Sequence, residues 1–444
     1  MLIEKLKKIV VENPNKIAYK IDNKKITYQD LWDLSLKYSN ILKKQGNSPV
    51  IIYNKKSIDV VVLILSCLMS RRAYIPLDFS TPKTRIDKIK NSSNSNLVIS
   101  KLEELDNINH YVDIKNNNEI AYIIFTSGTT GNPKGVPISY SNLDNFTKWI
   151  SSLLKYENIN VLNQASFSFD LSVADLYYSL FNGHTLVSID FQNNTYEHIF
   201  KIIKEEKINL IVSTPTFMKL CLINPEFNQT NFESLKCIYF CGESLEKELV
   251  KKIFEKFSNI RIINAYGPTE ATSAISAIEI TRKMLDCEEI LPVGDINNFA
   301  TNVEIINDEI VLSGPSVFNG YINDKEKIIK YFTGDVGYVR DGKLYCKGRI
   351  DRQIKHNGYR IELDDIEANL KSIDSIEECA VIYKYDKKII KAFVVTKKYN
   401  KIDDIKEKLQ LMLPSYMIPK VIKIIEKMPI NKNGKIDRRA LEKL

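Results

Sequence analysis

The sequence predicts an α/β protein with a large amino-terminal domain of layered, mostly parallel sheets and a small α+β carboxyl-terminal domain. The chain has 444 residues, of which 44% are hydrophobic and 27% charged, so it can bury a large core in two or three domains. From Met1 to about Tyr345, apolar strand-like runs alternate with amphipathic helical stretches, as in parallel sheets covered by helices. After Gly348 the segments become shorter and mixed. We therefore expect domains at residues 1–347 and 348–444.

The elements of the amino-terminal domain follow from the same alternation. The apolar run at residues 60–69 is compatible with either a buried helix or a buried strand. Two short runs, 303–306 and 309–313, flank Asn307-Asp308 and predict a β-hairpin, so this domain includes a β-rich subdomain. Strands are expected at 49–53, 121–125, 209–213, 234–240 and 261–265, and helices at 139–153, 197–206 and 245–257.

The carboxyl-terminal segment predicts a separate domain of roughly 95 residues, within the usual size range. Helices are expected near residues 363–372 and 402–413. Strands are expected near residues 380–385 and 390–396. Short helices and strands in this mixture are typical of α+β layers.

Charge and cysteine usage exclude several classes of protein. The formal net charge is +8, but the lysines are scattered without a dense basic tract, which argues against nucleic-acid binding. An acidic small molecule or an acidic protein partner fits this mild balance. The seven cysteines and four histidines form no Cys-x-x-Cys pair or cluster, so we expect no zinc site and a cytoplasmic protein. The amino terminus lacks a signal-peptide core, and the longest apolar run is about half of a membrane span.

Residues 126–135, Thr-Ser-Gly-Thr-Thr-Gly-Asn-Pro-Lys-Gly, form the most informative stretch of the chain. They follow a predicted strand and precede a predicted helix. The glycines let backbone N–H groups curl around an anion, the hydroxyls add donors, and Lys134 adds a mobile positive charge. The spacing differs from that of a Walker loop, in which Gly-Lys-Ser/Thr opens a helix. On composition alone, a phosphate site and an ordinary surface turn are equally good interpretations.

Four further motifs follow this glycine-rich loop. Asn264–Glu270, Asn-Ala-Tyr-Gly-Pro-Thr-Glu, should lie at the carboxyl end of a strand, where open α/β sheets bind ligands. Its aromatic ring, Gly-Pro turn and carboxylate suit a base and a hydrated metal. The other three motifs are Tyr331–Asp335, Gly348–Lys355 and Asn433–Arg438. Each motif is weak alone, but all four in this order form a strong joint signal.

Together these motifs resemble the adenylate-forming enzymes, which include acyl-CoA synthetases, luciferases and the adenylation domains of non-ribosomal peptide synthetases. The likeness extends from Ala73–Asp78 to Lys435, and its most specific parts are the loop 126–135 and Tyr266–Glu270. The resemblance implies a ligase that uses ATP and Mg²⁺. A carboxylate attacks the α-phosphate of ATP to give an acyl-adenylate and pyrophosphate, and a thiol then displaces AMP.

The resemblance also implies roles for individual residues. Asp335 would accept hydrogen bonds from both ribose hydroxyls, Arg349 would contact ribose or phosphate, and Glu270 would help to hold the metal. Lys435 would neutralise charge that develops at the α-phosphate, whereas its alternative interpretation is a solvated tail lysine. Lys435 and Arg349 are thus the candidate catalytic residues. The implied ATP-binding set is Thr126, Ser127, Gly128, Thr129, Thr130, Gly131, Lys134, Tyr266 (stacked on adenine), Gly267, Thr269, Asp335, Arg349 and Lys435.

Asp351 matches the hinge of the family. Rotation there would remove Lys435 from the site and bring residues 356–359 toward it, so the resemblance implies a mobile small domain. Gly358 would let a phosphopantetheine arm pass close to the backbone.

Asp170, in the segment Ala165–Val173, indicates which acid is activated. In the amino-acid-activating branch of the family, an aspartate at this position pairs with the α-ammonium group of the substrate. Activators of fatty and aryl acids lack it, because a buried carboxylate facing an apolar acid would be unpaired and costly. The alternative interpretation makes Asp170 a helix N-cap.

The rest of the implied pocket is small. Residues 239–243, Tyr-Phe-Cys-Gly-Glu, are similar to the D-alanine–carrier protein ligases of teichoic acid D-alanylation, as are 169–173 and 213–215. There a cysteine fills space beside the α-carbon and favours the D-enantiomer, whereas the alternative for Cys241 is an ordinary buried residue. D-Alanine is favoured, but glycine, L-alanine, serine and other small amino acids stay open, because a methylene is worth only roughly 1–3 kcal/mol. The implied lining residues are Ala174, Cys241, Ala265, Ser273 and Ala274, with Tyr239 nearby.

The chain departs from the family in two places and leaves other functions open. It is shorter than a typical member, and Arg71-Arg72 replaces the usual small lead-in before Ala73. No carrier segment follows Lys435, so we expect a free-standing enzyme acting on a separate carrier protein with an acidic surface. The alternatives are an adenylation enzyme of peptide-type biosynthesis, an acyl-CoA synthetase using free coenzyme A, and a non-catalytic binding protein on the same fold. Asp170 argues against the coenzyme A alternative.

Overall fold

A computed structural model describes residues 2–107, 119–128, 131–190, 194–324, 326–356, 358–397, 401–431 and 436–444. Contacts divide the chain into two compact units. The first unit contains Met1–Asp78, Asn94–Ile124 and Val136–Ile350, and the second contains Phe79–Ser93, Phe125–Gly135 and Asp351–Leu444. The last segment of the second unit therefore begins at Asp351, whereas the sequence suggested a boundary after residue 347. The second unit also includes two earlier segments of the chain. The predicted α/β class with a small α+β portion is confirmed.

The largest sheet of the first unit has eight strands among the described residues. Its six inner strands run parallel, and the two edge strands pair antiparallel. The inner strands β10 and β11 are buried along their whole length, because helices cover both faces. The strands predicted at 209–213 and 261–265 are confirmed, whereas the one predicted at 234–240 begins only at Cys237. In sheet order the strands are β13 (Ser276–Glu279), β12 (Arg261–Tyr266), β11 (Cys237–Phe240), β10 (Leu210–Ser213), β8 (Asn160–Asn163), β9 (Thr185–Ser188), β1 (Ile17–Ile21) and β2 (Lys24–Thr27).

The two faces of this sheet pack into separate hydrophobic clusters, because successive side chains of a strand point to opposite faces. In β11, Tyr239 belongs to one cluster, whereas Ile238 and Phe240 belong to the other. Helices α1, α2, α3, α6 and α7 contribute to the first cluster, and α8 to α11 contribute to the second. The apolar run 60–69 lies in α3 and is therefore a helix. The helices are α1 (Leu2–Glu12), α2 (Tyr28–Leu42), α3 (Ile58–Met69), α5 (Glu103–Asp106), α6 (Tyr140–Leu154), α7 (Leu171–Leu180), α8 (Tyr196–Glu205), α9 (Pro215–Ile223), α10 (Lys247–Lys256) and α11 (Arg282–Cys287).

Two five-stranded sheets contain the other strands that the structure describes before Ile350. One is the predicted β-rich subdomain, and its neighbouring strands pair antiparallel throughout. Its hairpin turns at Asn307 and Asp308, whose φ angles of 51° and 65° suit a tight turn between twisted strands. In sheet order this subdomain has β14 (Gly294–Asp295), β18 (Lys343–Arg349), β17 (Tyr331–Arg340), β16 (Glu309–Ser313) and β15 (Asn302–Ile306), and the other sheet has β5 (Leu97–Ile99), β3 (Val50–Tyr53), β4 (Tyr74–Leu77), β6 (Ile120–Thr126) and β7 (Lys134–Ser139).

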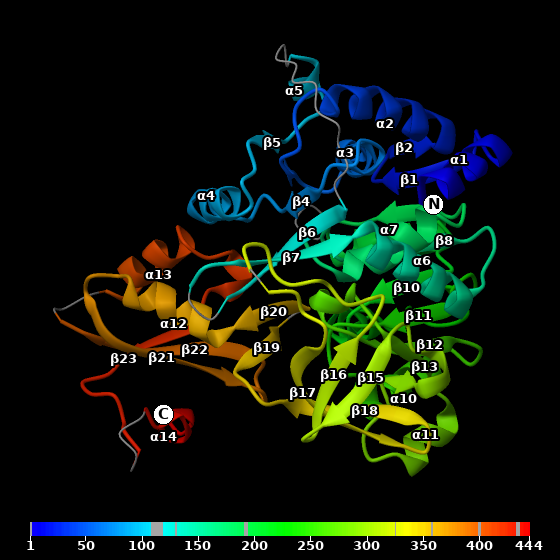
Figure 1. Cartoon of the computed structure of the whole chain (residues 1–444). Helices are drawn as coiled ribbons and strands as arrows, with labels where there is room; N and C mark the ends of the chain where they lie inside the picture. The colour runs from blue at the N-terminus through cyan, green and yellow to red at the C-terminus, as the bar shows by residue number, and fades with distance from the viewer. Residues whose placement is uncertain are drawn as a thin grey trace. The chain divides into compact units, whose positions relative to one another are not determined.

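The carboxyl-terminal part of the second unit is built on a three-stranded sheet of β21 (Ile376–Lys384), β22 (Ile389–Thr396) and β23 (Val421–Ile424). Figure 1 shows α12 (Leu363–Lys371) and α13 (Ile402–Gln410) on one face of this sheet and α14 (Arg438–Glu442) on the other, in agreement with its two hydrophobic clusters. The predicted helices and strands of this region are thus confirmed. The unit also contains the hairpin β19 (Gln353–His356) and β20 (Tyr359–Glu362), together with α4 (Lys83–Ser92). Among all the helices that the structure describes, none has the length and apolarity needed to cross a bilayer.

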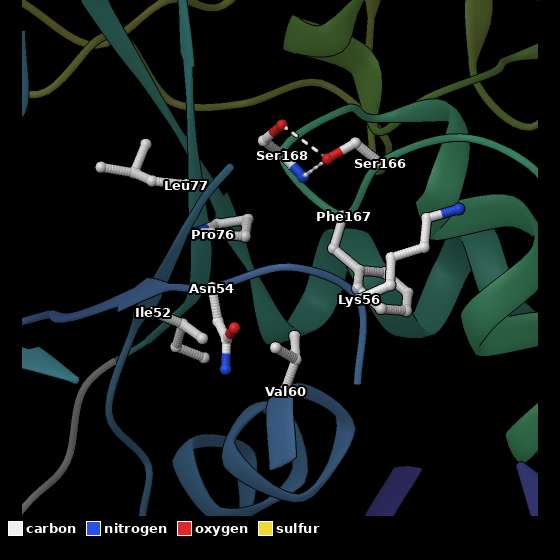
Figure 2. Close-up of a pocket in the computed structure, with 9 residues that line it drawn as sticks. All are labelled: Ile52, Asn54, Lys56, Val60, Pro76, Leu77, Ser166, Phe167 and Ser168. Carbon is white, nitrogen blue, oxygen red and sulfur yellow. Dashed lines mark hydrogen bonds between the residues drawn. The ribbon is translucent and has the colours of Figure 1, made fainter. Parts of the chain in front are cut away.

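A lysine joins the loop after β3 to the ends of β8 and β9 within the first unit. The Nζ of Lys56 donates hydrogen bonds to the carbonyl oxygens of Asn163 at 3.2 Å, Gln164 at 2.8 Å and Ile189 at 3.0 Å. Figure 2 shows its ammonium group directed away from Val60 and the other residues of a small adjoining pocket. The pocket is lined by Ile52, Asn54, Lys56, Val60, Pro76, Leu77, Ser166, Phe167 and Ser168. Because the three carbonyl groups lie at the ends of β8 and β9, Lys56 connects the sheet that contains β3 with the eight-stranded sheet.

A buried carboxyl group, that of Asp175 in α7, contacts Asn163, one of the residues that Lys56 binds. Both of its oxygens accept hydrogen bonds from the Asn163 side-chain amide at 3.0 Å. The amide oxygen of Asn163 accepts in turn from Ser188 Oγ at 2.6 Å. Burial raises the pKa of Asp175 to about 8, although the hydrogen bonds from Asn163 and the charge of Lys56 oppose the rise. The folded chain therefore holds a proton on this group that the unfolded chain releases near pH 4.

We predict that Asp175 makes stability fall as pH rises from about 4 to about 8. In this window the unfolded carboxyl ionises while the folded one stays protonated, so each rise in pH favours unfolding. Asp175→Asn should flatten this dependence when the free energy of unfolding is measured in urea at pH 5 and pH 7.5. Asp286→Asn, at an exposed aspartate of α11, serves as the control. Parallel pH curves for wild type and Asp175→Asn would contradict the prediction.

Candidate active site

The carboxyl end of β12 carries the motif that begins at Asn264, as the sequence predicted. Tyr266 is the last residue of this strand, and its hydroxyl donates a hydrogen bond to Asp335 Oδ2 at 2.6 Å. Burial and the neighbouring Asp335 carboxylate raise the pKa of Tyr266 well above its usual value, so the hydroxyl remains a donor. The structure therefore brings together the residues expected at adenine and at ribose.

Arg349 approaches the same carboxylate from the neighbouring strand. Asp335 and Arg349 are cross-strand partners in the β17–β18 pair, and Nη1 of Arg349 lies 2.7 Å from Oδ1 of Asp335. Nη2 of Arg349 donates to the carbonyl oxygen of Thr333 at 3.0 Å. Each carboxylate oxygen of Asp335 thus has one donor within the protein, and the arginine is oriented by two contacts.

Asp170 occupies the N-cap position of α7, but its side chain does not cap the helix. Its φ and ψ angles of −64° and −23° are helical, and it makes no side-chain capping bond. Oδ2 of Asp170 instead accepts a hydrogen bond from Thr269 Oγ1 at 2.6 Å. The capping interpretation is therefore wrong. The partly exposed carboxylate is held by a residue of the motif at the end of β12.

The backbone within and directly after this motif is tightly constrained. A Cβ atom on Gly267 would lie 2.5 Å from Cα of Ala274, so no larger residue fits there. Thr272 and Ser273 adopt φ angles of 60° and 70°, in the left-handed region that non-glycine residues seldom occupy. Such strain persists only where the surrounding structure enforces it, and it is concentrated at functional sites.

The residues expected to line the amino-acid pocket lie on neighbouring elements of the first unit. Cys241 directly follows β11, and its Sγ lies 3.7 Å from the carbonyl oxygen of Ser273. Both side chains are buried, at 3% relative exposure each. Ala174 of α7, Ala265 of β12, Ala274, Tyr239 and Cys241 belong to one hydrophobic cluster. These side chains thus belong to the same core as α7, the helix that follows Asp170, and their role in a substrate pocket stays a prediction.

Glu270 is fully buried in the short 3-10 helix Thr269–Ala271. Its Oε1 accepts a hydrogen bond from the hydroxyl of Tyr321 at 2.8 Å. Within the parts of the chain that the structure describes, no three His, Cys, Asp or Glu side chains are grouped for a metal. A single oriented carboxylate nevertheless fits Mg²⁺, which is usually held by one or two carboxylates together with phosphates and water.

The whole glycine-rich loop belongs to the second unit, and its last two residues begin β7. Thr126 ends β6 and Lys134, which is exposed, begins β7. A Cβ on Gly128 would lie 2.1 Å from the carbonyl oxygen of Asn132, and Gly131 has a φ of +77°, so both positions require glycine. Thr129 and Thr130 lie outside the described residues.

Within the second unit, Ser127 of this loop contacts the strand β20. Its Oγ accepts a hydrogen bond from the backbone N–H of Glu362 at 2.8 Å and donates to the carbonyl oxygen of Arg360 at 3.3 Å. Lys88 of α4 donates to the carbonyl oxygen of Gly131 at 3.0 Å. The loop is thus held by contacts at both ends of its glycine-rich segment.

The predicted residues of the small α+β portion are Asp351, Gly358 and Lys435. Asp351 is its first residue, and Oδ1 of Asp351 accepts from the backbone N–H of Gln353 at 3.1 Å. Gly358 has a φ of +84°, at the turn between β19 and β20, where glycine is favoured. Lys435 lies outside the described residues, and Ile436 is the next residue that the structure describes.

Sequence reasoning missed several partners of the predicted residues. The sequence did not indicate that Tyr321 would bind Glu270 or that Thr333 would bind Arg349. It also did not indicate that Thr269 would donate to Asp170. Gly320-Tyr321 could have drawn attention as a glycine turn followed by an aromatic residue. Nothing in the sequence indicated that Thr269 would contact a residue 99 positions earlier.

The chain matches two protein-family models. Residues 6–114 and 100–322 match the model of the AMP-binding enzymes. Residues 365–435 match the model of the AMP-binding enzyme C-terminal domain.

Similar proteins cover the whole chain. A D-alanine–D-alanyl carrier protein ligase of Listeria monocytogenes serotype 4b is 36% identical over 99% of this chain and 98% of its own length. Among solved structures, the Vibrio cholerae adenylation domain AlmE in complex with glycyl-adenosine-5'-phosphate has a TM-score of 0.85, with 23% identity over 100% of this chain and 97% of its own. The o-succinylbenzoate CoA synthetase of Bacillus subtilis also has a TM-score of 0.85, with 21% identity over 99% and 98% of the two chains.

The two structural likenesses confirm the predicted fold. The family models and the ligase relative confirm the resemblance inferred from the motifs, including its similarity to the D-alanine–carrier protein ligases. The chain belongs to the AMP-binding enzyme family.

Proposed function

We propose that this chain is an ATP-dependent, AMP-forming ligase that activates D-alanine and transfers it to the phosphopantetheine thiol of a separate carrier protein. The observation that carries the proposal is the Asp170 carboxylate, which is held by Thr269 instead of capping α7. A partly exposed carboxylate fixed in this way can pair with an α-ammonium group. Full-length relatives named D-alanine–D-alanyl carrier protein ligase support the same substrate.

The residues expected to bind ATP each have a role in this proposal. Tyr266 stacks on the adenine, and Asp335 accepts hydrogen bonds from the ribose hydroxyls, with Arg349 beside it. The glycine-rich loop, including Lys134, surrounds the β- and γ-phosphates. Glu270 would hold Mg²⁺, and the bound ion would neutralise phosphate charge.

The first half-reaction joins the amino acid to AMP. The substrate carboxylate attacks the α-phosphorus, the bond to the bridging oxygen breaks, and pyrophosphate leaves with the electron pair. Asp170 holds the ammonium end of the substrate, and Lys435 provides positive charge at the carboxylate and the α-phosphate. The two residues thus hold opposite ends of one zwitterion, which aligns the reacting atoms.

The second half-reaction uses a different arrangement of the small domain. Rotation at Asp351 withdraws Lys435 and brings the turn at Gly358 to the site. The positive φ of Gly358 and its missing side chain let a pantetheine arm pass along the backbone. The thiolate then attacks the acyl carbon, and AMP leaves as the C–O bond breaks. The carrier protein has an acidic surface that suits the net charge of +8, and the reaction takes place in the cytoplasm.

An exchange panel tests the proposed function. The enzyme should catalyse exchange of labelled pyrophosphate into ATP with D-alanine, and less with glycine, L-alanine and serine. Fatty and aryl acids should give no exchange, because the Asp170 carboxylate would be left unpaired. Preference for a fatty or aryl acid would favour an acyl-CoA synthetase, and preference for another small amino acid would favour peptide-type biosynthesis. Absence of exchange with every acid would favour a non-catalytic protein.

Asp170→Ala should lower kcat/KM for D-alanine in pyrophosphate exchange by roughly 100-fold or more. The reason is that the substrate ammonium group loses its charge partner in a partly desolvated site. Asp286→Ala, at an exposed position, is the matched control and should leave exchange unchanged. A neutral effect of Asp170→Ala would move the substrate away from amino acids.

Cys241→Ala should reduce discrimination between D- and L-alanine by about tenfold, because it opens space beside the α-carbon of the substrate. The measurement is the ratio of kcat/KM for the two enantiomers in pyrophosphate exchange. Cys221→Ala removes another buried thiol, which lies in the cluster on the opposite face of the sheet, and should leave the ratio unchanged. An unchanged ratio in Cys241→Ala would argue against the assigned role of this cysteine.

A further inference from the structure

A buried carboxylate of α12, Glu367, connects the residue next to the hinge with the segment that follows Lys435. Its side chain is 10% exposed. Its Oε1 accepts hydrogen bonds from Nη2 of Arg352 and from the backbone N–H of Val381, both at 2.8 Å. Nη2 of Arg438 lies 3.1 Å from each of its two carboxylate oxygens. Burial opposes ionisation of Glu367, but the bonds from Arg352 and Val381 outweigh it and hold the pKa below its usual value.

Arg352 forms the hinge side of this connection. It is the residue directly after Asp351 and precedes β19. Besides Glu367, it contacts the carboxylate of Asp364 and donates to the carbonyl oxygen of Val381 at 2.6 Å. The backbone at the hinge end of the small domain is therefore tied to α12 and β21.

Arg438 forms the other side, three residues after Lys435. Ile430 and Ile436, which lie on the two sides of Lys435 in the sequence, form an antiparallel bridge. The backbone N–H of Asp437 donates to the carbonyl oxygen of Pro429 at 2.7 Å. Asp437 then caps α14 by accepting from the N–H of Ala440 at 3.1 Å. The described residues on both sides of Lys435 in the sequence are thus held in place, and Arg438 links them to Glu367.

The charges make this link depend on Glu367. Two guanidinium groups, those of Arg352 and Arg438, share the one carboxylate. Asp364 contacts only Arg352 among the ion pairs of the described residues, so removal of the Glu367 charge leaves Arg438 without a carboxylate partner there. Two like charges would then face the same buried position, which is strongly unfavourable.

We propose that Glu367 is a positioning residue that transmits rotation at the hinge to Lys435, so that the small domain carries this lysine as a rigid arm. The inference rests on the proposed function and deepens it. Glu367 itself contacts no substrate. Its loss should affect the step that needs Lys435 and spare the step from which Lys435 is withdrawn.

The test compares both half-reactions in Glu367→Gln, using the full chain. Pyrophosphate exchange with D-alanine should lose roughly tenfold to 100-fold in kcat, because small displacements of a catalytic group are costly. The KM values for ATP and D-alanine should change much less than kcat, since all their proposed binding residues except Lys435 remain in place. Release of AMP from preformed D-alanyl-adenylate with free pantetheine should also stay close to wild type. Glu378→Gln, at an exposed glutamate of β21, is the matched control.

A second comparison separates positioning from general stability. In a Lys435→Ala background, Glu367→Gln should cause no further loss of exchange, because the group that it positions is already absent. Additive losses, or equal loss of both half-reactions, would overturn the inference. If the wild-type enzyme is active and Glu367→Gln behaves in the same way, the inference about Glu367 fails but the proposed function stands. If the wild-type enzyme itself is inactive, both the inference and the proposed function fail.

A third variant covers the case in which Glu367→Gln unfolds the small domain. Adding Arg438→Gln removes one of the two facing charges and should restore the Tm. Pyrophosphate exchange should stay low, because the contact between residues 367 and 438 is still missing. Recovery of exchange together with the Tm would show that Glu367 acts only through stability, and the inference would fail.

Discussion

The carboxylate of Asp335 is the interaction on which the nucleotide side of the site depends. It lies opposite Arg349 in the β17–β18 pair and also accepts a hydrogen bond from Tyr266 at the end of β12. Two sheets of the first unit are thus joined at one carboxylate. Because both donors are already aligned, the charge and orientation of Asp335 are set before a ligand arrives, and less reorganisation is needed during binding. The pairing of β17 with β18 therefore fixes how Arg349 and Asp335 face each other.

The amino-acid side of the site depends on a different constraint, the packed backbone after β12. Gly267 fits only without a side chain, and Thr272 and Ser273 are held at positive φ. This backbone brings Thr269 to Asp170 and places the Ser273 carbonyl beside Cys241. Strain of this kind is maintained by the buried surroundings, and here it accompanies one carboxylate held in a fixed orientation.

The two-step chemistry that we propose requires one charged group to stay in the site during both steps and another to leave it between them. A fixed carboxylate such as Asp170 can serve both steps, whereas a lysine that favours adenylate formation must leave before a thiol approaches. A hinge solves this only if the moving domain is rigid between the hinge and the lysine. The shared contacts of Glu367 with Arg352 and Arg438 are suited to provide that rigidity.

Local patterns in the sequence were enough to predict the α/β class, most strands and helices, and the motif residues, because hydrophobic periodicity and glycine requirements act over short distances. They could not decide whether the run 60–69 is a helix, since short apolar runs suit both structures. They also left the role of Asp170 open, because its donor Thr269 is 99 residues away and only the folded chain brings the two together. The same holds for Asp175 and Glu367, whose protonation and ion pairs depend on burial among distant segments. Burial and long-range contacts are properties of the tertiary structure, and no local pattern encodes them.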